Sequence, residues 1–264
     1  MKNNKWLLAF MTLMIVAILA ACGESEDKDN GSTSSEGEGK KTLVVGTSAD
    51  YPPFEFVDTA NSDEIVGFDI ELIKIAAEKL GYDVKVQNMD FNSLIPALQA
   101  KQFDVVISGM TPTEERKKVV DFSVPYYETL QYMVFKKEKG YTSPADLKGA
   151  KVGGQTSSIQ LDLAEALGAE HGFTAESRTL IPDLVQELKI GRLDGAIIEN
   201  IVSENYLAQN DDLAAFEIEV DDPDYKAVVF QKGSSLKAEF DKVIEELEAD
   251  GTIEKLKQKW ITAE

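Results

Sequence analysis

Residues 111–127, with the sequence TPTEERKKVVDFSVPYY, follow an apolar run at 105–107 that predicts a buried strand. Thr111 and Glu114 have the spacing of a capping box, which predicts a short helix that begins here. Arg116 would then lie just beyond the carboxyl end of the strand, where ligands bind in open α/β sheets. A guanidinium in that place could bind a carboxylate in a bidentate manner. From the local sequence alone, a solvated surface arginine is an equally good interpretation.

Predicted strands and helices alternate on both sides of this stretch, which favours mostly parallel sheets. Strands are expected at 43–45, 84–86, 103–107, 131–135, 152–153, 194–198 and 226–230. Helices are expected at 70–80 with Asp69 as N-cap, at 94–100, 159–167, 180–190 and 201–209, and from 236 onward. This order predicts an α/β protein of two lobes, formed by 41–129 with 224–264 and by 130–223. Two extended crossings near 129–133 and 223–228 would join the lobes.

The composition of the chain excludes several classes of function. It has 264 residues and a formal net charge of -20, whereas nucleic-acid binding requires a basic face. Cys22 is the only cysteine, so disulfides and cysteine-rich metal sites are excluded. The only histidine, His171, lies far from the other candidate residues, and no nucleophile–base pair is evident. We therefore expect neither a metal nor a cofactor, and no catalysis.

The N-terminus has the features of an export signal. Lys2 and Lys5 precede an apolar run at 6–21, which ends in Leu-Ala-Ala before Cys22. This junction resembles the lipobox of bacterial lipoproteins, which implies a signal peptide at 1–21 and a lipid on the Cys22 sulfur. An ordinary signal peptide with a coincidental cysteine is the alternative. Residues 22–40 have the composition of a disordered tether. We expect a lipid-anchored protein on the outer face of a membrane, with a Gram-positive surface favoured.

The globular part, from about residue 41 to 264, resembles the polar-amino-acid family of bacterial solute-binding proteins that serve ABC importers. The resemblance rests on the order and spacing of several motifs. They are YPPFEF at 51–56, GFD at 67–69, MDF at 89–91, SGMT at 108–111 continuing to Tyr127, and residues 194–200. It implies a two-lobe "Venus flytrap" fold, each lobe a mixed sheet flanked by helices, with two hinge crossings. It further implies a monomer that binds a free L-amino acid between its lobes and delivers it to a permease and an ATPase.

The resemblance also implies a set of ligand-binding residues, which are Tyr51, Phe91, Ser108, Gly109, Thr111, Arg116, Gln155, Ser157, Ser158 and Glu199. Arg116 would bind the ligand α-carboxylate, helped by the hydrogen bonds of the other polar residues. Tyr51 and Phe91 would enclose the ligand side chain. Glu199 stands where the family usually has Asp, the acceptor of the α-ammonium. Arg116 and Glu199 together would thus bind the two charges of a zwitterion.

The identity of the amino acid stays open at this stage. Ser48 stands where some binders of basic amino acids carry Asp, and Asp50 and Glu55 are nearby candidates to accept a distal cation. The family resemblance, helped by the acidic composition, favours arginine or lysine, while glutamine, histidine and cystine are alternatives. A dehydratase-type enzyme and a sensor domain on the same scaffold are less favoured readings.

Overall fold

The computed structural model describes residues 40–220 and 224–261. All the described residues belong to one compact unit, Lys40–Glu264. The predicted signal peptide, the lipid attachment at Cys22 and the tether up to residue 39 lie outside the described residues. Within 40–220 and 224–261, no helix has the length and hydropathy needed to cross a bilayer.

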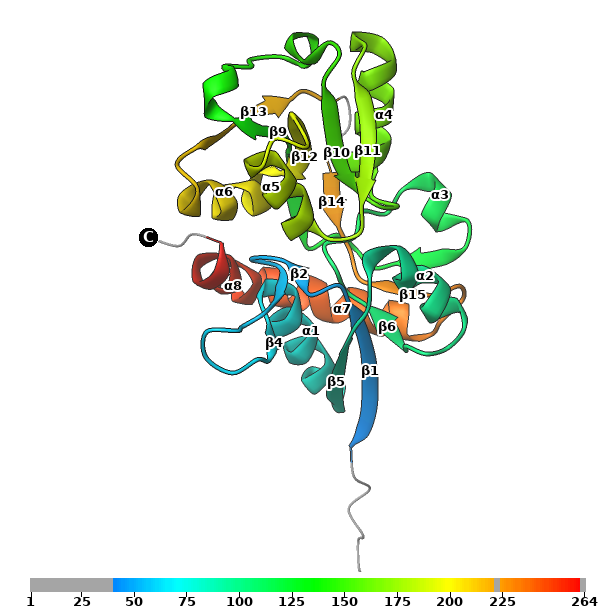
Figure 1. Cartoon of the computed structure of the whole chain (residues 1–264). Helices are drawn as coiled ribbons and strands as arrows, with labels where there is room; N and C mark the ends of the chain where they lie inside the picture. The colour runs from blue at the N-terminus through cyan, green and yellow to red at the C-terminus, as the bar shows by residue number, and fades with distance from the viewer. Residues whose placement is uncertain (1–39, 221–223, 262–264) are drawn as a thin grey trace, which may run out of the picture. The chain divides into compact units, whose positions relative to one another are not determined.

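The first lobe is built on a five-stranded sheet in the order β5-β1-β6-β15-β7. Its strands are β5 (Tyr82–Asn88), β1 (Lys41–Thr47), β6 (Val105–Val106), β15 (Val229–Gln231) and β7 (Val120–Phe122). β1 pairs in parallel with both β5 and β6, whereas β15 runs antiparallel to β6 and β7. Helix α2 (Phe91–Gln99) packs on β1 and β6, while α1 (Phe68–Lys79), α7 (Leu236–Ala249) and α8 (Thr252–Trp260) pack on one another. Figure 1 shows this arrangement.

The second lobe is built on another five-stranded sheet, in the order β11-β10-β12-β9-β13. Its strands are β11 (Thr174–Arg178), β10 (Lys151–Gln155), β12 (Gly195–Glu199), β9 (Gln131–Lys136) and β13 (Leu213–Ile218). Alternating apolar residues fill both faces: Ile197 lies in the core with Ala164 of α4 (Ile159–His171), and Ala196 in the core with Leu184 of α5 (Ile181–Lys189). Helix α6 (Asn200–Gln209) follows β12 directly.

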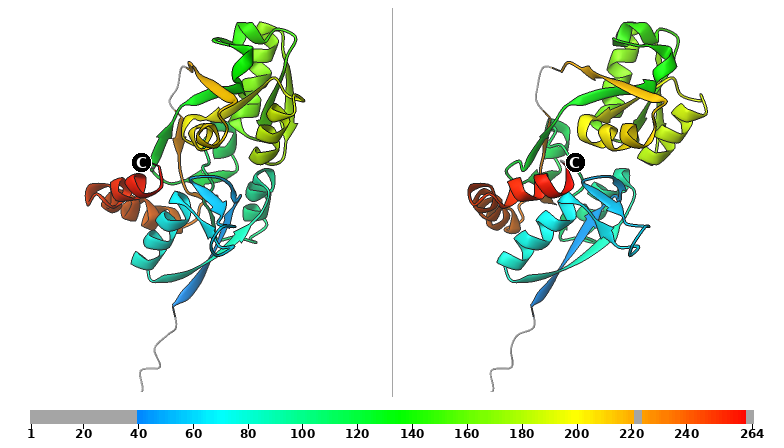
Figure 2. Two further views of the ribbon diagram at one scale, coloured as in Figure 1. Left: turned by 60° about the vertical axis from the view of Figure 1, so that its left-hand side comes forward. Right: turned by 90° about the vertical axis from the view of Figure 1, so that its left-hand side faces the viewer.

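Two short antiparallel strands connect the sheets. β8 (Tyr127–Thr129) pairs with β14 (Asp224–Lys226), and both leave one sheet and enter the other, as the views in Figure 2 show. A smaller sheet is formed by β2 (Asp50–Tyr51), β3 (Glu55–Val57) and β4 (Ile65–Val66). The remaining elements are α3 (Glu114–Lys117) and the 3₁₀ turns η1 (Lys137–Lys139) and η2 (Pro144–Leu147). The predicted α/β fold with two lobes and mixed sheets is confirmed. The boundaries proposed for the lobes remain a prediction.

Several local predictions were wrong. Gly67, not Asp69, is the N-cap of α1, and Asp69 lies buried within the first turn. Gly67 has a φ of 130°, and a Cβ there would lie 2.2 Å from the Phe54 carbonyl oxygen, so a glycine is required. Thr113, not Thr111, caps α3, because the Thr111 hydroxyl is bonded to Asp224 instead. The strand expected at 226–230 is divided into β14 and β15.

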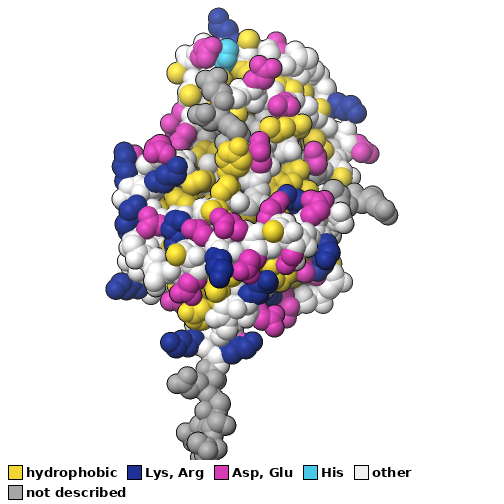
Figure 3. All heavy atoms as spheres, turned by 180° about the vertical axis from the view of Figure 1, so that it is seen from behind, with side chains coloured by type: hydrophobic (Ala, Val, Ile, Leu, Met, Phe, Trp, Pro, Cys, Tyr) yellow, Lys and Arg dark blue, Asp and Glu magenta, His cyan; other side chains and the backbone are white. Residues whose placement is uncertain are grey.

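Charged side chains of both signs are interspersed on the face of the molecule in Figure 3. The many acidic residues of the sequence therefore form no broad single-sign field on that face. Several of the exposed ion pairs join neighbouring residues of one element, such as Lys117 with Glu114 at 2.8 Å. Such exposed pairs contribute little to stability, typically well under about 1 kcal/mol each.

Candidate functional site

A polar cavity lies where four strands end. β1, β6, β10 and β12 carry their following loops to one place, and side chains from both lobes line the space. The lining residues are Ser48, Asp50, Tyr51, Glu55, Phe91, Ser108, Gly109, Thr111, Arg116, Gln155, Ser158, Ile159, Gln160 and Glu199. Nine of the ten residues predicted to bind ligand are therefore brought together. Ser157 is the tenth, and it lines the adjoining pocket instead.

The cavity is nearly filled by its own side chains. The free space inside it is about 10 Å³, which is room for roughly one water molecule. A larger molecule can enter only if the two lobes move apart or if the lining side chains rearrange. The polar groups of the two lobes meanwhile bond to one another across the cavity.

Arg116 connects the lobes through its guanidinium. Nη1 donates to the Thr111 carbonyl at 2.8 Å, and Nη2 donates to the Ser157 carbonyl of the other lobe at 2.9 Å. The guanidinium carbon lies 5.4 Å from the centre of the Phe91 ring. Burial lowers the pKa of Arg116, yet the group stays charged. Two bonds use two of its five N–H groups, so donors remain for a carboxylate. Arg116 is not the solvated surface arginine that the local sequence also allowed.

The loop after β10 presents backbone and side-chain groups from the second lobe. Ser157 has a φ of 64°, in the left-handed region, and its contribution is the carbonyl that Arg116 binds. Ser158 caps α4: its hydroxyl accepts from the Leu161 N–H at 3.2 Å. Gln155 donates to the Asp50 carboxylate at 3.0 Å, across the lobes. The positive end of α4 thus faces the cavity, as suits an anionic group.

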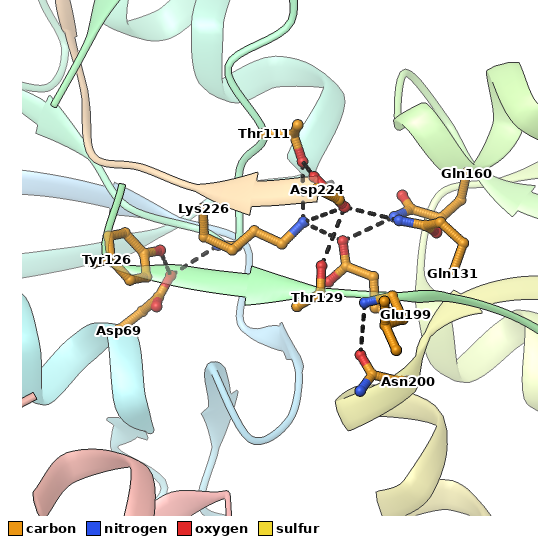
Figure 4. A network of polar contacts seen from close by, with 12 residues as sticks. Asp69, Thr111, Tyr126, Thr129, Gln131, Gln160, Glu199, Asn200, Asp224 and Lys226 are labelled. Atoms are coloured by element: carbon orange, nitrogen blue, oxygen red, sulfur yellow. Dashed lines mark hydrogen bonds and ion pairs between the residues drawn. The ribbon is translucent and has the colours of Figure 1, made fainter. Parts of the chain in front are cut away.

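Glu199 lies at the end of β12 and is fully buried. Its Oε1 accepts from Lys226 Nζ and, at 2.9 Å, from Gln160 Nε2. Its Oε2 has no hydrogen-bond partner among the described residues. Burial raises the pKa of Glu199 to about 7, against the opposing attraction of Lys226. One oxygen of this carboxylate is therefore engaged and the other is available (Figure 4).

Lys226 is the residue that the sequence analysis missed. Its side chain is completely buried, and its ammonium also bonds Asp224 Oδ2 at 2.8 Å and Thr111 Oγ1 at 3.0 Å. Asp224 in turn accepts from Gln131 Nε2 at 2.8 Å. The available signal was a lysine within DYKAVVF, at 224–230, because an apolar strand rarely carries an unpaired charge inside a protein.

Two further buried carboxylates shape the first-lobe side of the cavity. Glu55 Oε1 accepts from the Ser108 hydroxyl at 2.8 Å, and Asp69 Oδ2 accepts from the Gly109 N–H at 2.8 Å and from the Tyr126 hydroxyl at 2.7 Å. Burial raises the pKa of Glu55 well above its usual range and also raises that of Asp69. These acids hold the loop at 108–109, and Glu55, a candidate to accept a distal cation, is buried at the cavity.

Asp50, in the first lobe, contacts the N-terminus of helix α5, which belongs to the second lobe. Its Oδ2 accepts from the Ile181 N–H at 2.9 Å as well as from Gln155, and its Oδ1 accepts from the Ser48 hydroxyl at 2.9 Å. Burial raises the pKa of Asp50, and the bond from the Ile181 N–H opposes that shift.

Among the described residues, no group of three or more His, Cys, Asp or Glu side chains is arranged to hold a metal ion.

Two α/β lobes, two short crossings and a polar cavity between the strand ends together define a two-lobe solute-binding protein. The chain belongs to family 3 of the bacterial extracellular solute-binding proteins, whose family model matches residues 43–263. This confirms the resemblance from which the site residues were predicted.

Individual relatives are similar over nearly the whole chain. The arginine-binding extracellular protein ArtP of Bacillus subtilis (strain 168) is 51% identical over 267 residues, covering 99% of each chain. The structure of an ancestral arginine-binding protein bound to arginine has a TM-score of 0.78 and 41% identity, covering 84% of this chain and 99% of that one. A structure of an ancestral arginine-binding protein bound to glutamine has a TM-score of 0.77 and 40% identity, covering 85% and 99%.

Proposed function

We propose that this protein captures free L-arginine in the cavity between its lobes and delivers it to an ABC importer. The observation that carries the proposal is the opposite charge of two groups that line one cavity. The Arg116 guanidinium retains unused donors, and Glu199 Oε2 is a buried acceptor without a partner among the described residues. An α-amino acid carries one carboxylate and one ammonium, and these two groups match its charges.

The lining supports a cationic side chain on the ligand. It contains three acidic side chains, Asp50, Glu55 and Glu199, and one basic side chain, Arg116. Burial raises the pKa of all three acids, a shift that a bound cation would reverse. The identity of 51% with ArtP, an arginine-binding protein, supports the same choice.

Glutamine is the second candidate. The support for it comes from two similar structures of ancestral arginine-binding proteins, of which one is bound to arginine and the other to glutamine. Glutamine has the same zwitterionic head, so Arg116 and Glu199 would serve it equally. The two ligands differ only at the distal end, where the acidic lining favours the guanidinium.

The proposal extends to the site residues and to the parts of the protein around them. The ten predicted residues contact the ligand or, for Ser157, hold Arg116 in place. Residues 41–129 with 224–264 and residues 130–223 are the lobes that move, and the protein acts as a monomer without catalysis. Residues 1–21 are removed, and a lipid on Cys22 anchors the protein to the outer face of a Gram-positive cell membrane. Its partners are the permease and ATPase subunits of the importer.

A thermal-shift panel of the twenty amino acids tests the proposal. Because a ligand that binds only the folded state raises Tm, purified protein should show its largest increase with L-arginine and a smaller one with L-lysine. At a ligand concentration of roughly 100 times Kd, the folded state gains about 2.7 kcal/mol. Strong stabilisation by glutamine with none by arginine would replace arginine with glutamine. No stabilisation by any of the twenty would refute the amino-acid proposal as a whole.

A further inference from the structure

Lys226 lies at the centre of a buried polar network, which joins Thr111, Glu199, Asp224, Gln131 and Gln160 (Figure 4). The side chain of Lys226 has no exposed surface. Its ammonium has three N–H donors, and the three acceptors around it are Thr111 Oγ1, Asp224 Oδ2 and Glu199 Oε1. Every donor is therefore used within the protein, and none is directed at a ligand.

The network does not balance its charges. It contains two carboxylates, Glu199 and Asp224, and one ammonium, so its ionised form carries one net negative charge. Asp224 has both oxygens engaged: Oδ1 accepts from Thr111, and Oδ2 accepts from Thr129, Gln131 and Lys226. Glu199 keeps one oxygen, Oε2, without a partner among the described residues. Within this network, the uncompensated charge and the free acceptor thus coincide on Glu199, which lines the cavity.

We propose that Lys226 is a specificity-determining residue that sets the charge of this network to a single negative unit, matched to one ligand ammonium. Without Lys226, two carboxylates would face each other in a buried site, and a proton or a second cation would be required. With Lys226, Asp224 is neutralised and Glu199 Oε2 is left for the ligand. The inference rests on the proposed function, because it concerns how that same site recognises an amino acid.

Lys226 is also placed to hold Glu199 in position from the other side of the cavity. It belongs to β14, which pairs with β8 between the lobes, whereas Glu199 ends β12 in the second lobe. Gln160 and Lys226 bond the same oxygen of Glu199, so the carboxylate can present only its other oxygen. The nearby acids Glu55 and Asp69 are bonded by Ser108, Gly109 and Tyr126, and no hydrogen bond joins either of them to Lys226. Glu55 Oε2 and Asp69 Oδ1 also lack a partner among the described residues, but neither acid shares an oxygen with a buried ammonium.

Charge rescue tests the proposal. Calorimetric titration with L-arginine, at one pH and salt concentration, would compare wild type, Lys226→Met, Asp224→Asn and the double variant. Lys226→Met leaves two negative charges and Asp224→Asn leaves none, so each should raise Kd roughly 30-fold or more. The double variant restores one negative charge and should bind at least about tenfold more tightly than either single variant, as a coupled pair in a double-mutant cycle.

Lys232→Met is the matched control. Lys232 lies on the surface, with 56% of its side chain exposed and Asp121 at 2.7 Å, and its loss should leave Kd unchanged. Circular dichroism and thermal unfolding without ligand establish which variants fold. The inference is overturned if Lys226→Met binds like wild type, or if the double variant binds no better than Asp224→Asn. The second comparison holds even if Lys226→Met alone does not fold. If wild type itself does not bind arginine, the proposed function fails and takes this inference with it, whereas the two outcomes above overturn the inference alone.

Discussion

Glu199 shows how one residue can serve the fold and the ligand at once. Its Oε1 is used twice, by Gln160 and by Lys226, while Oε2 has no partner among the described residues. The family resemblance predicted an acid at this position as the acceptor of the ligand ammonium. The structure adds that the acid is already half engaged, so the geometry of its free oxygen is fixed before a ligand arrives.

The ionisation of Glu199 should make arginine binding depend on pH. Burial raises its pKa to about 7 in the protein without ligand, and an ammonium ion binds the ionised form. Below that pKa the carboxyl must first lose its proton, so Kd should rise by up to about tenfold for each pH unit of acidification. Above it, Kd should become constant. Neither ionised group of the amino acid head titrates near pH 7. Calorimetry with L-arginine between about pH 5.5 and 8 measures this dependence.

Glu199→Gln is the control for that experiment, because the other acids around the cavity remain in it. Burial also raises the pKa of Asp50, Glu55 and Asp69, and any contribution from them would persist in the variant. The variant should bind more weakly and show a smaller change of Kd with pH. Equal pH dependence in wild type and variant would contradict the role of Glu199.

At the scale of elements, the contact between β10 and α4 positions the second-lobe half of the site. A Cβ on Gly154 would lie 2.6 Å from the Leu161 Cα and 2.7 Å from its backbone nitrogen. Both atoms belong to the first turn of α4. Two residues at the start of this helix, the N-cap Ser158 and Gln160 in the first turn, line the cavity. Gly154→Ala should therefore displace this turn, destabilise the fold by about 1–3 kcal/mol and weaken arginine binding.

Chemical denaturation and calorimetry of Gly154→Ala measure the two effects. Ser177→Ala is the control, because Ser177 is the exposed partner of Gly154 on β11 and its loss removes no packing. A Gly154→Ala protein with the stability and affinity of wild type would mean that α4 can shift freely on β10.

Hydrophobic periodicity predicted most of the elements, because the strands and helices of both cores carry apolar residues at regular spacing. β11 was missed, since its sequence TAESR is polar and it lies at the edge of its sheet. Asp69 was taken for a helix cap because it stands directly before the apolar helical pattern at 70–80. Its carboxylate instead bonds Gly109 and Tyr126, which are distant in sequence.

The candidate site was predictable only in part, for a similar reason. Its ligand-facing residues follow strand ends, and their motifs resemble those of a family. Lys226 carries no such motif. Its importance depends on Glu199 and Thr111, which reach it only when the two lobes come together. Pairings of this kind, between residues far apart in the chain, leave no periodic signal in the sequence.

At the scale of the whole globular unit, hydrogen bonds between side chains and backbone join the lobes at the cavity. Arg116 bonds the Ser157 carbonyl, Asp50 bonds Gln155 and Ile181, and Lys226 bonds Glu199. These contacts close the cleft around little free space. A ligand can enter only if the lobes move apart or the lining side chains rearrange, and under the proposed function its own charges then meet Arg116 and Glu199. Binding therefore exchanges the contacts that the lobes make with each other for the contacts that they make with the ligand. The affinity for an amino acid depends on the difference in free energy between these two sets of contacts.

The most direct test of this account is a calorimetric titration of wild type and Arg116→Ala with L-arginine and with agmatine, which lacks the carboxylate. L-arginine should bind wild type at one site. If Arg116 binds the α-carboxylate, removing the carboxylate from the ligand or the guanidinium from the protein should weaken binding by about 2–5 kcal/mol. Agmatine should not distinguish the two proteins. Arg192→Ala, on an exposed turn, should match wild type. Equal binding of arginine and agmatine by wild type, or undiminished arginine binding by Arg116→Ala, would contradict the account.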